Sequence, residues 1–318
     1  MNLLPFAFVF PGQGSQSVGM LDAWGDHPAV AQTLAEASDA LDQDMALLIK
    51  EGPKETLALT THTQPVMLVA GVAAYRVWMA ETGTPPAVMA GHSLGEYSAL
   101  VASGVLSLSQ AAPLVRFRAQ AMQAAVPVGV GAMAAILGLD AKKVIEGCAE
   151  AMATFAGQSS EVVEAVNFND PLQTVIAGSK AAVDKACEVL KANGAKRALL
   201  LAVSAPFHSS LMKPAALALR EKLEVVVFAA PQIPVINNID VTSETDANAI
   251  RAALYRQSFG PVRWVESVRA IKARSVGHIV ECGPGKVLAG LVKRIDSELT
   301  GAPLFDPASL ADVKEMLA

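Results

Sequence analysis

The sequence predicts an α/β protein in which a large domain is built on a parallel sheet and a smaller α+β domain is inserted into it. Near both ends of the chain, apolar strand patterns alternate with helical ones, which favours a parallel sheet with helices on its faces. Between residues 130 and 202 the order becomes strand, helix, strand, strand, helix, strand, which is typical of a ferredoxin-like unit. We therefore expect residues 1–129 and 203–318 to form the large domain.

The large domain begins with an apolar strand, "FAFVF", that ends in the glycine loop "PGQGSQ". A strong helical pattern follows over residues 65–79, with Pro65 favoured in its first turn. A short strand at "AVMAGHS" then precedes a helix that ends at Gly104, and a second helix runs over 108–125. Residues 278–295 repeat the order of strand, turn and helix.

The inserted domain contains four strand patterns and two helical ones. The expected strands are "GAMAAILGL", "VVEAVNFN", "LQTVIAGS" and "AKRALLLAVS", and the expected helices are "AKKVIEGCAEAM" and "KAAVDKACEVLKANG".

Composition excludes several classes of function. Acidic residues outnumber basic ones, 30 to 25, which argues against a nucleic-acid partner. No stretch approaches the roughly 20 apolar residues of a membrane span. The three cysteines form no CxxC pair, which suits a reducing cytoplasm. No dinucleotide fingerprint, phosphate loop or zinc-like cluster is present, so we expect no cofactor and no metal.

The stretch "GHSLG" around Ser93 fits GxSxG, in which glycines permit a strained turn that exposes a nucleophilic serine. An apolar strand precedes it and a helix follows, as that motif requires, and this favours an α/β-hydrolase-like large domain. The helix that begins near Leu94 directs free N–H groups toward the serine oxygen.

Among the five histidines, His208 is the best candidate for a general base. It lies in "SAPFHSSLM", just after a strand, where a loop at the carboxyl end of a sheet would present it. No carboxylate stands out as a third member. A Ser–His pair oriented by an amide or a backbone carbonyl is therefore as reasonable as a full triad.

Arg118 is the most informative charge, because its helical neighbours three and four residues away are all apolar. A buried arginine requires an anion. That anion is either an internal carboxylate or the carboxylate of a substrate. Arg116 has Gln120 one turn on and should be more exposed.

Eight segments, taken in order from about residue 6 to residue 295, resemble the malonyl-CoA:acyl-carrier-protein transacylases of bacterial fatty acid synthesis. They are "FVFPGQGSQ", "THTQPVML", "GHSLGEYSAL", "RFRAQAMQ", "VNFNDP", "APFHSSLM", "QSFGPVRW" and "CGPGKVLAGL".

The resemblance implies a role for each matching residue. Ser93 matches the acylated nucleophile, His208 the general base, and Arg118 the arginine that binds the malonyl carboxylate. Gln13 and the backbone N–H of Leu94 match the oxyanion site. Gln64 and Asn167 match polar residues that line the acyl and pantetheine pocket. Gln257 matches the residue whose backbone carbonyl orients the histidine, and Phe207 matches a residue of the malonyl-selective members.

The implied reaction is a ping-pong transfer of malonyl from malonyl-CoA, through a malonyl-serine, to the phosphopantetheine thiol of acyl carrier protein. The enzyme itself would be a monomer. A serine thioesterase, an acyltransferase of a polyketide pathway and a scaffold without activity are the alternatives. Docking of an acidic carrier would need a local basic patch. Candidate residues are Lys196, Arg197, Lys286, Lys293 and Arg294.

Overall fold

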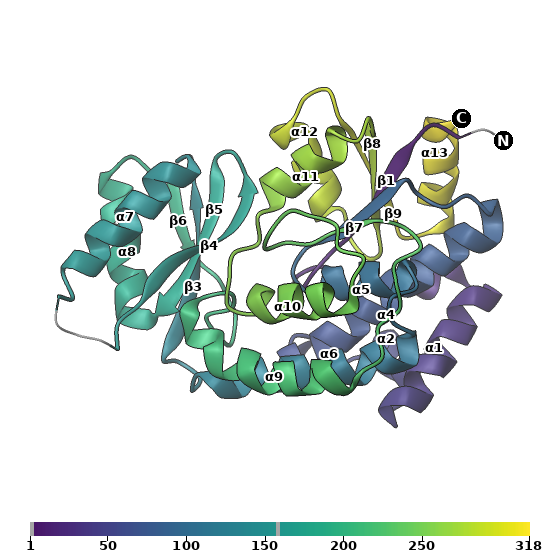
Figure 1. Ribbon diagram of the computed structural model, residues 1–318, viewed down its shortest axis with the longest axis horizontal. Coiled ribbons are helices and arrows are strands. Elements are labelled where there is room, and N and C mark those ends of the chain that lie inside the picture. The colour runs from purple at the N-terminus through teal and green to yellow at the C-terminus, as the bar shows by residue number, and fades with distance from the viewer. Residues whose placement is uncertain (1–2, 157–159) are drawn as a thin grey trace.

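A computed structural model describes residues 3–156 and 160–318 and contains two separate sheets (Figure 1). The larger sheet lies near both termini, and the smaller one lies at the other end of the long axis. The termini are side by side, because the Leu4 N–H donates to the Leu317 carbonyl at 2.8 Å.

The larger sheet is parallel throughout, as predicted, with the strand order β7-β2-β1-β8-β9. Its central strand β1 is buried on both faces, which explains the unbroken apolar run "FAFVF". The strands are β1 (Phe6–Phe10), β2 (Val88–Gly91), β7 (Val235–Ile236), β8 (His278–Cys282) and β9 (Thr300–Leu304).

Helices cover both faces of this sheet. One core cluster contains the three β1 phenylalanines and receives side chains from α1 (Pro28–Leu41), α2 (Met45–Glu51), α3 (Lys54–Leu57), α4 (Thr60–Thr82), α5 (Gly95–Ala102), α6 (Leu108–Ala125), α9 (Lys213–Val225), α10 (Ala247–Gln257) and α13 (Pro307–Leu317). On the opposite face, Ala7 and Val9 pack with α11 (Trp264–Lys272) and α12 (Val287–Ile295). Two short 3-10 helices, η1 (Asp22–Trp24) and η2 (Ser210–Met212), complete the unit.

Helix α4 begins at Thr60 and not at Pro65, because the polar stretch ahead of the proline is also helical. The predicted helix over 108–125 coincides with α6. None of the helices that the structure describes is long and apolar enough to cross a membrane.

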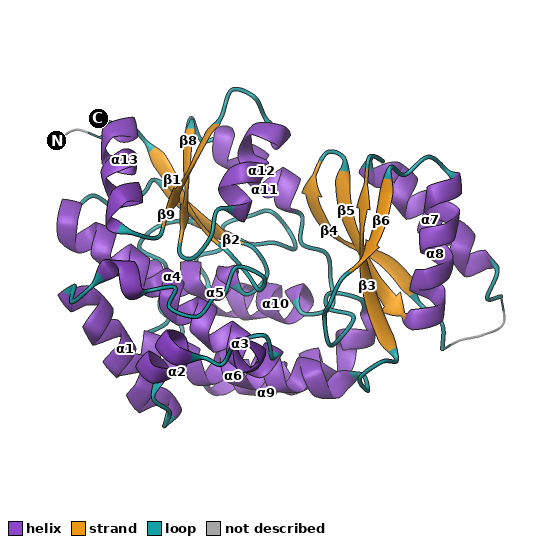
Figure 2. Cartoon of the chain, turned by 180° about the vertical axis from the view of Figure 1, so that it is seen from behind, coloured by secondary structure: helices purple, strands orange, loops and turns teal. Residues whose placement is uncertain are grey.

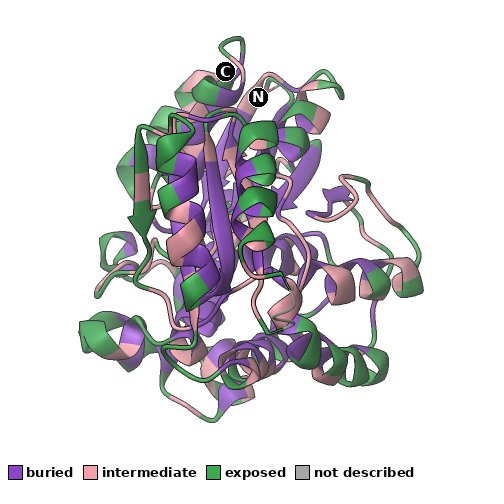
Figure 3. Cartoon of the chain, turned by 90° about the vertical axis from the view of Figure 1, so that its left-hand side faces the viewer, coloured by how far each residue is buried: buried purple, intermediate pink, exposed green. Residues whose placement is uncertain are grey.

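The second sheet is antiparallel, with the order β4-β5-β3-β6. Along the chain its elements are β3 (Gly131–Leu137), α7 (Ala141–Ala153), β4 (Val163–Asp170), β5 (Gln173–Ser179), α8 (Lys180–Ala192) and β6 (Arg197–Leu200). Both helices lie on the face away from the larger sheet: Figure 2 shows them beside the strands on that side, and Figure 3 shows the strands behind them. The strand predicted over 195–204 is shorter than expected, because the chain leaves β3 after Leu201 to return to the larger sheet.

Main-chain hydrogen bonds join β4, an edge strand of the smaller sheet, to the segment just before α11. The N–H of Val262 donates to the Val166 carbonyl at 2.8 Å, and the N–H of Phe168 donates to the Val262 carbonyl at 3.0 Å. Arg294 on α12 forms an ion pair with Asp170 on β4 at 3.4 Å. The β4 edge of the smaller sheet is therefore attached to the larger unit through α11 and α12.

The turn between β2 and α5 is packed against β1 so closely that its two glycines tolerate no side chain. A Cβ atom at Gly91 would lie 1.9 Å from the carbonyl carbon of Gly95, and one at Gly95 would lie 2.0 Å from the Phe10 oxygen. Both obstacles are backbone, which cannot move without displacing a strand or a helix. The sheet thus fixes the position of whatever residue stands at the centre of this turn.

We expect Gly95→Ala to destabilise the fold by about 3 kcal/mol or more, since overpacking against backbone is poorly relieved. Urea denaturation followed by circular dichroism measures the free energy of unfolding. Gly290→Ala is the matched control, because a Cβ there meets nothing within 4 Å and alanine favours helix α12. Equal effects of the two substitutions would contradict this account of the turn.

Candidate active site

Ser93 stands at the centre of the turn between β2 and α5, with a φ of 54°. Such a left-handed conformation is uncommon for a residue with a side chain and is typical of strained functional turns. It directs the hydroxyl toward His208, and Ser93 Oγ lies 2.6 Å from His208 Nε2. The structure therefore brings together the two residues that the sequence analysis proposed as nucleophile and base.

The tautomer of His208 follows from its second hydrogen bond. His208 Nδ1 lies 2.9 Å from the backbone carbonyl of Gln257, and a carbonyl only accepts. Nδ1 therefore carries the proton, and Nε2 presents its lone pair to the Ser93 hydroxyl. Of the two arrangements left open above, the structure has a backbone carbonyl and not a third carboxylate.

Burial, and after it the charge of Arg118, lowers the pKa of His208 to about 3. The imidazole is consequently neutral at physiological pH and free to accept a proton. A general base needs this state before reaction begins.

The Arg118 side chain is 1 % exposed and lies beside the nucleophile. Its Nη1 donates to Gln64 Oε1 at 2.7 Å, and its Nη2 donates to Gln257 Oε1 at 3.1 Å and to Ser93 Oγ at 3.3 Å. Within the described residues no carboxylate lies within 4.0 Å of the guanidinium, and its Nε has no partner. The buried charge is thus held by neutral oxygens only, with the Tyr97 ring 5.5 Å away.

One backbone N–H next to Ser93 has no hydrogen-bond partner within the described residues. The Ser93 N–H donates to Asn238 Oδ1 at 2.7 Å, whereas the Leu94 N–H has no acceptor in the described part of the chain. The loop with Gln13 approaches from β1, and Gly12 lies against the His92 carbonyl. Leu94 thus offers a free donor at the start of α5, and Gln13 lies at the rim of the same cavity.

These groups open into a cavity of about 200 Å³ between the two sheets. The larger unit contributes Gln13, Gln64, Ser93 and Arg118, and the smaller one contributes Asn167 and the apolar side chains Met133 and Val175. Phe207 lines the cavity beside His208. Gln257 does not line it: its side chain is fully buried behind Arg118, so we place it among the positioning groups and not among those that touch a substrate.

Comparison with known proteins identifies the family. The family model for the acyl transferase domain matches residues 7–302. The malonyl CoA-acyl carrier protein transacylase of Escherichia coli K12 is 53% identical over 98% of this chain and 99% of its own length. This chain belongs to the malonyl CoA-acyl carrier protein transacylase family.

Solved structures of related proteins agree with this. The acyl-carrier-protein S-malonyltransferase from Burkholderia pseudomallei has 62% sequence identity and a TM-score of 0.95, with 98% of this chain and 100% of that one covered. A malonyl-transacylase in complex with the acyl-carrier protein of a type II polyketide synthase has 51% identity and a TM-score of 0.94, over 98% and 99% of the two chains.

Two buried residues behind the nucleophile, Asn238 and Glu96, were not predicted from the sequence. Asn238 hydrogen-bonds to two residues of the turn that holds Ser93. Its Oδ1 accepts from the Ser93 N–H, and its Nδ2 donates to the Gly91 carbonyl at 2.6 Å. Glu96 Oε2 accepts from the Asn238 N–H at 2.9 Å and from Gln257 Nε2 at 3.0 Å. Burial raises the pKa of Glu96 to about 7.

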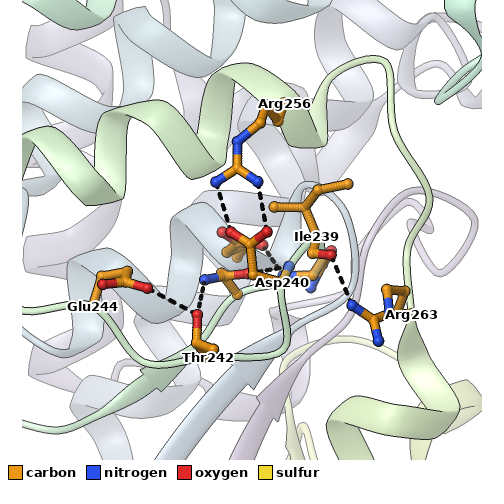
Figure 4. A network of polar contacts seen from close by, with 9 residues as sticks. Ile239, Asp240, Thr242, Glu244, Arg256 and Arg263 are labelled. Atoms are coloured by element: carbon orange, nitrogen blue, oxygen red, sulfur yellow. Dashed lines mark hydrogen bonds and ion pairs between the residues drawn. The ribbon is translucent and has the colours of Figure 1, made fainter.

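A more exposed ion pair fastens the loop of Asn238 to helix α10. Figure 4 shows Arg256 on α10 gripping both oxygens of Asp240, at 2.5 and 2.6 Å, while Arg263 donates to the Ile239 carbonyl at 3.2 Å. Gln257 is the next residue after Arg256. This contact therefore holds Asn238 and Gln257 in a fixed relation to one another.

His92 and Asn169 also line the cavity, and they pair with each other. His92 Nε2 lies 2.8 Å from Asn169 Oδ1, so the ring bonds across the cavity and not to Ser93. Among the described residues no group of three or more His, Cys, Asp or Glu side chains could hold a metal ion.

The lowered pKa of His208 predicts an unusual pH dependence. Because only the neutral imidazole acts as a base, a pKa near 3 keeps it active as the pH falls, whereas an ordinary histidine loses activity below about pH 6.5. We expect the rate at which a neutral sulfonyl fluoride modifies Ser93 to change less than about twofold between about pH 8 and pH 5. A fall with a midpoint near pH 6.5 would contradict the assignment.

Proposed function

We propose that this chain transfers a malonyl group from malonyl-CoA to the phosphopantetheine thiol of acyl carrier protein, which supplies extender units for fatty acid synthesis. The observation that carries the proposal is the buried Arg118 guanidinium, which has no carboxylate of the described residues within 4.0 Å and lies 3.3 Å from the hydroxyl of a Ser–His pair. A substrate with a free carboxylate next to a reactive carbonyl completes this arrangement. The names of the relatives support the same substrate and partner.

In the first half-reaction His208 Nε2 takes the hydroxyl proton as Ser93 Oγ attacks the malonyl thioester carbonyl. The Leu94 N–H, together with Gln13, stabilises the oxyanion, and one such donor contributes on the order of 3 kcal/mol. When the intermediate collapses, the C–S bond breaks. The imidazolium returns its proton to the departing thiolate, which leaves coenzyme A and malonyl-Ser93.

In the second half-reaction the pantetheine thiol of the carrier attacks the ester. His208 Nε2 takes the thiol proton and gives it back to Ser93 Oγ as the C–O bond breaks, so the enzyme is regenerated. The Gln257 carbonyl holds the imidazole in the required tautomer during both steps. No other acid or base is needed for the protons to balance.

Selectivity follows from the cost of burying a charge. When malonyl binds, its carboxylate forms a bidentate pair with Arg118, and Gln64 holds the guanidinium in place from the other side. An acetyl group would leave the charge unpaired, at a cost of roughly 3–5 kcal/mol. Asn167 and Phe207 form the wall along which the acyl chain and pantetheine lie.

We also propose that the two sheets belong to two domains of known fold types. The strand order β4-β5-β3-β6, with α7 and α8 on one face, supports a ferredoxin-like domain over residues 130–202, inserted in an α/β-hydrolase-like domain of residues 1–129 and 203–318. A monomeric state, a cytoplasmic location and the lack of a cofactor stay predictions. The three free thiols support a reducing environment.

Docking of the carrier is proposed at the mouth of the cavity. Lys196 and Arg197 are exposed at the start of β6, which leads directly to the cavity-lining Leu201, and Lys286 and Lys293 are exposed at helix α12. Arg294 is less suited to the role than predicted, because Asp170 already pairs with it. Four of the five candidate charges thus remain available to an acidic partner.

We expect Arg118→Ala to lower the preference for malonyl-CoA over acetyl-CoA by about a hundredfold or more, because the charge that distinguishes the two is removed. The readout is the ratio of kcat/KM for acylation by the two thioesters. Arg116→Ala is the matched control on the same helix, since the hydrogen bonds of Arg116 to other described residues go to Leu41 and Gln43, away from Ser93. An unchanged ratio in Arg118→Ala would overturn the proposed clamp.

A further inference from the structure

Glu96 carries a carboxyl group that takes no part in the proposed reaction. It does not contact Ser93 Oγ or His208 itself, but hydrogen-bonds to residues that contact Ser93 and Arg118. It is 2 % exposed in the first turn of α5 and does not line the catalytic cavity. A single oxygen, Oε2, accepts from two donors: the backbone N–H of Asn238 and the side-chain amide of Gln257. Each of these partners touches the catalytic groups directly.

The Gln257 amide has only one orientation that satisfies all its neighbours. Its Nε2 donates to Glu96 Oε2 at 3.0 Å and to the Ser93 carbonyl at 2.9 Å, and an ionised carboxylate and a carbonyl are acceptors only. Its Oε1 must therefore face Arg118, from which it accepts at 3.1 Å. In the reversed orientation the NH2 group would meet a guanidinium, a donor against a donor.

The direction in which the Arg118 guanidinium points depends on the orientation of the Gln257 amide. Two amide oxygens, of Gln64 and Gln257, accept hydrogen bonds from the guanidinium, and its one other hydrogen bond within the described residues goes to Ser93 Oγ. When Ser93 is acylated, its Oγ becomes an ester oxygen, which is a weaker acceptor for Arg118. The two amide oxygens are then the main hydrogen-bond partners that orient the arginine while it binds the carboxylate of the acyl group. If the Gln257 amide loses its fixed orientation, the Arg118 guanidinium therefore loses a hydrogen bond that holds it in position.

We propose that Glu96 is a positioning residue for acyl selectivity: by fixing the Gln257 amide it turns an acceptor toward Arg118 and holds the guanidinium where a substrate carboxylate binds. The inference rests on the proposed malonyl transfer and adds to it a residue that never touches the substrate. Its second hydrogen bond, to the Asn238 N–H, anchors the loop that grips the Ser93 turn.

The test is the Glu96→Gln variant, assayed at about pH 8 so that the wild-type carboxyl, with its pKa of about 7, is ionised. Mass spectrometry of the intact protein gives the rate of acyl-serine formation from malonyl-CoA and from acetyl-CoA. A neutral amide oxygen is a weaker acceptor than a carboxylate, so we expect the malonyl-to-acetyl ratio of kcat/KM to fall about five- to tenfold. The rate with acetyl-CoA should change less than about twofold.

Glu281→Gln is the matched control. Glu281 is equally buried, has a pKa raised to about 7 by burial, and accepts from the Ala289 N–H on the far side of β8, so its ratio should not change. A merely structural role of Glu96 would slow both thioesters equally, and that result would overturn the proposal. An unchanged ratio would overturn it too.

Two further variants keep the proposal falsifiable. If Glu96→Gln does not fold, Glu96→Asp retains the charge but is too short to reach both amides, and it should lower the ratio in the same direction. In a Gln257→Met background, which keeps the backbone carbonyl for His208, Glu96→Gln should have no further effect on the ratio. If the wild type forms no malonyl-serine, the proposed function and this inference both fail. If the wild type is malonylated but Glu96→Gln has the same malonyl-to-acetyl ratio as the wild type, only this inference fails.

Discussion

Burying a positive charge beside a nucleophile without a carboxylate in direct contact costs free energy, and the arrangement of this site follows from that cost. The Arg118 guanidinium is supported by two amide oxygens, a hydroxyl and the face of Tyr97, which stabilise the charge only in part. The same charge contributes to the low pKa of His208 and so keeps the base neutral. In the reaction that we propose, a bound malonyl carboxylate pairs directly with this charge.

The base and the clamp are not independent, because Gln257 connects them. Its backbone carbonyl orients His208, while its side-chain amide holds Arg118 and the carbonyl of Ser93. Gln257 is the last residue of α10, and the Asp240–Arg256 pair in Figure 4 fixes that helix end to the neighbouring loop. A displacement of this helix end would therefore disturb nucleophile, base and acyl recognition together.

Much of the fold and the chemical centre could be predicted because their signals are local. The strand patterns, and the glycines on either side of Ser93, lie within a few residues of what they determine. Arg118 was found because helical spacing placed it among apolar neighbours. The roles themselves came from the family resemblance, and the geometry now gives them a physical basis.

Long-range polar contacts could not be predicted in this way. Glu96 lies inside the segment "GHSLGEYSAL", but its partners Asn238 and Gln257 are 142 and 161 residues further along the chain. No periodicity or spacing reports a bond of that length, and a lone Asn or Gln in a loop has no motif around it. Likewise, the group that orients His208 is a main-chain carbonyl, which every residue possesses and no sequence pattern distinguishes.

The most direct test of the central claim is mass spectrometry of the intact protein after mixing with malonyl-CoA and then with phosphopantetheinylated carrier protein. The account predicts a malonyl adduct on Ser93 that persists in buffer and moves to the carrier when the carrier is added. An adduct that decays equally fast without the carrier would indicate a thioesterase. The absence of any adduct would show that the buried Arg118 beside Ser93 does not receive a malonyl group, and would contradict the account.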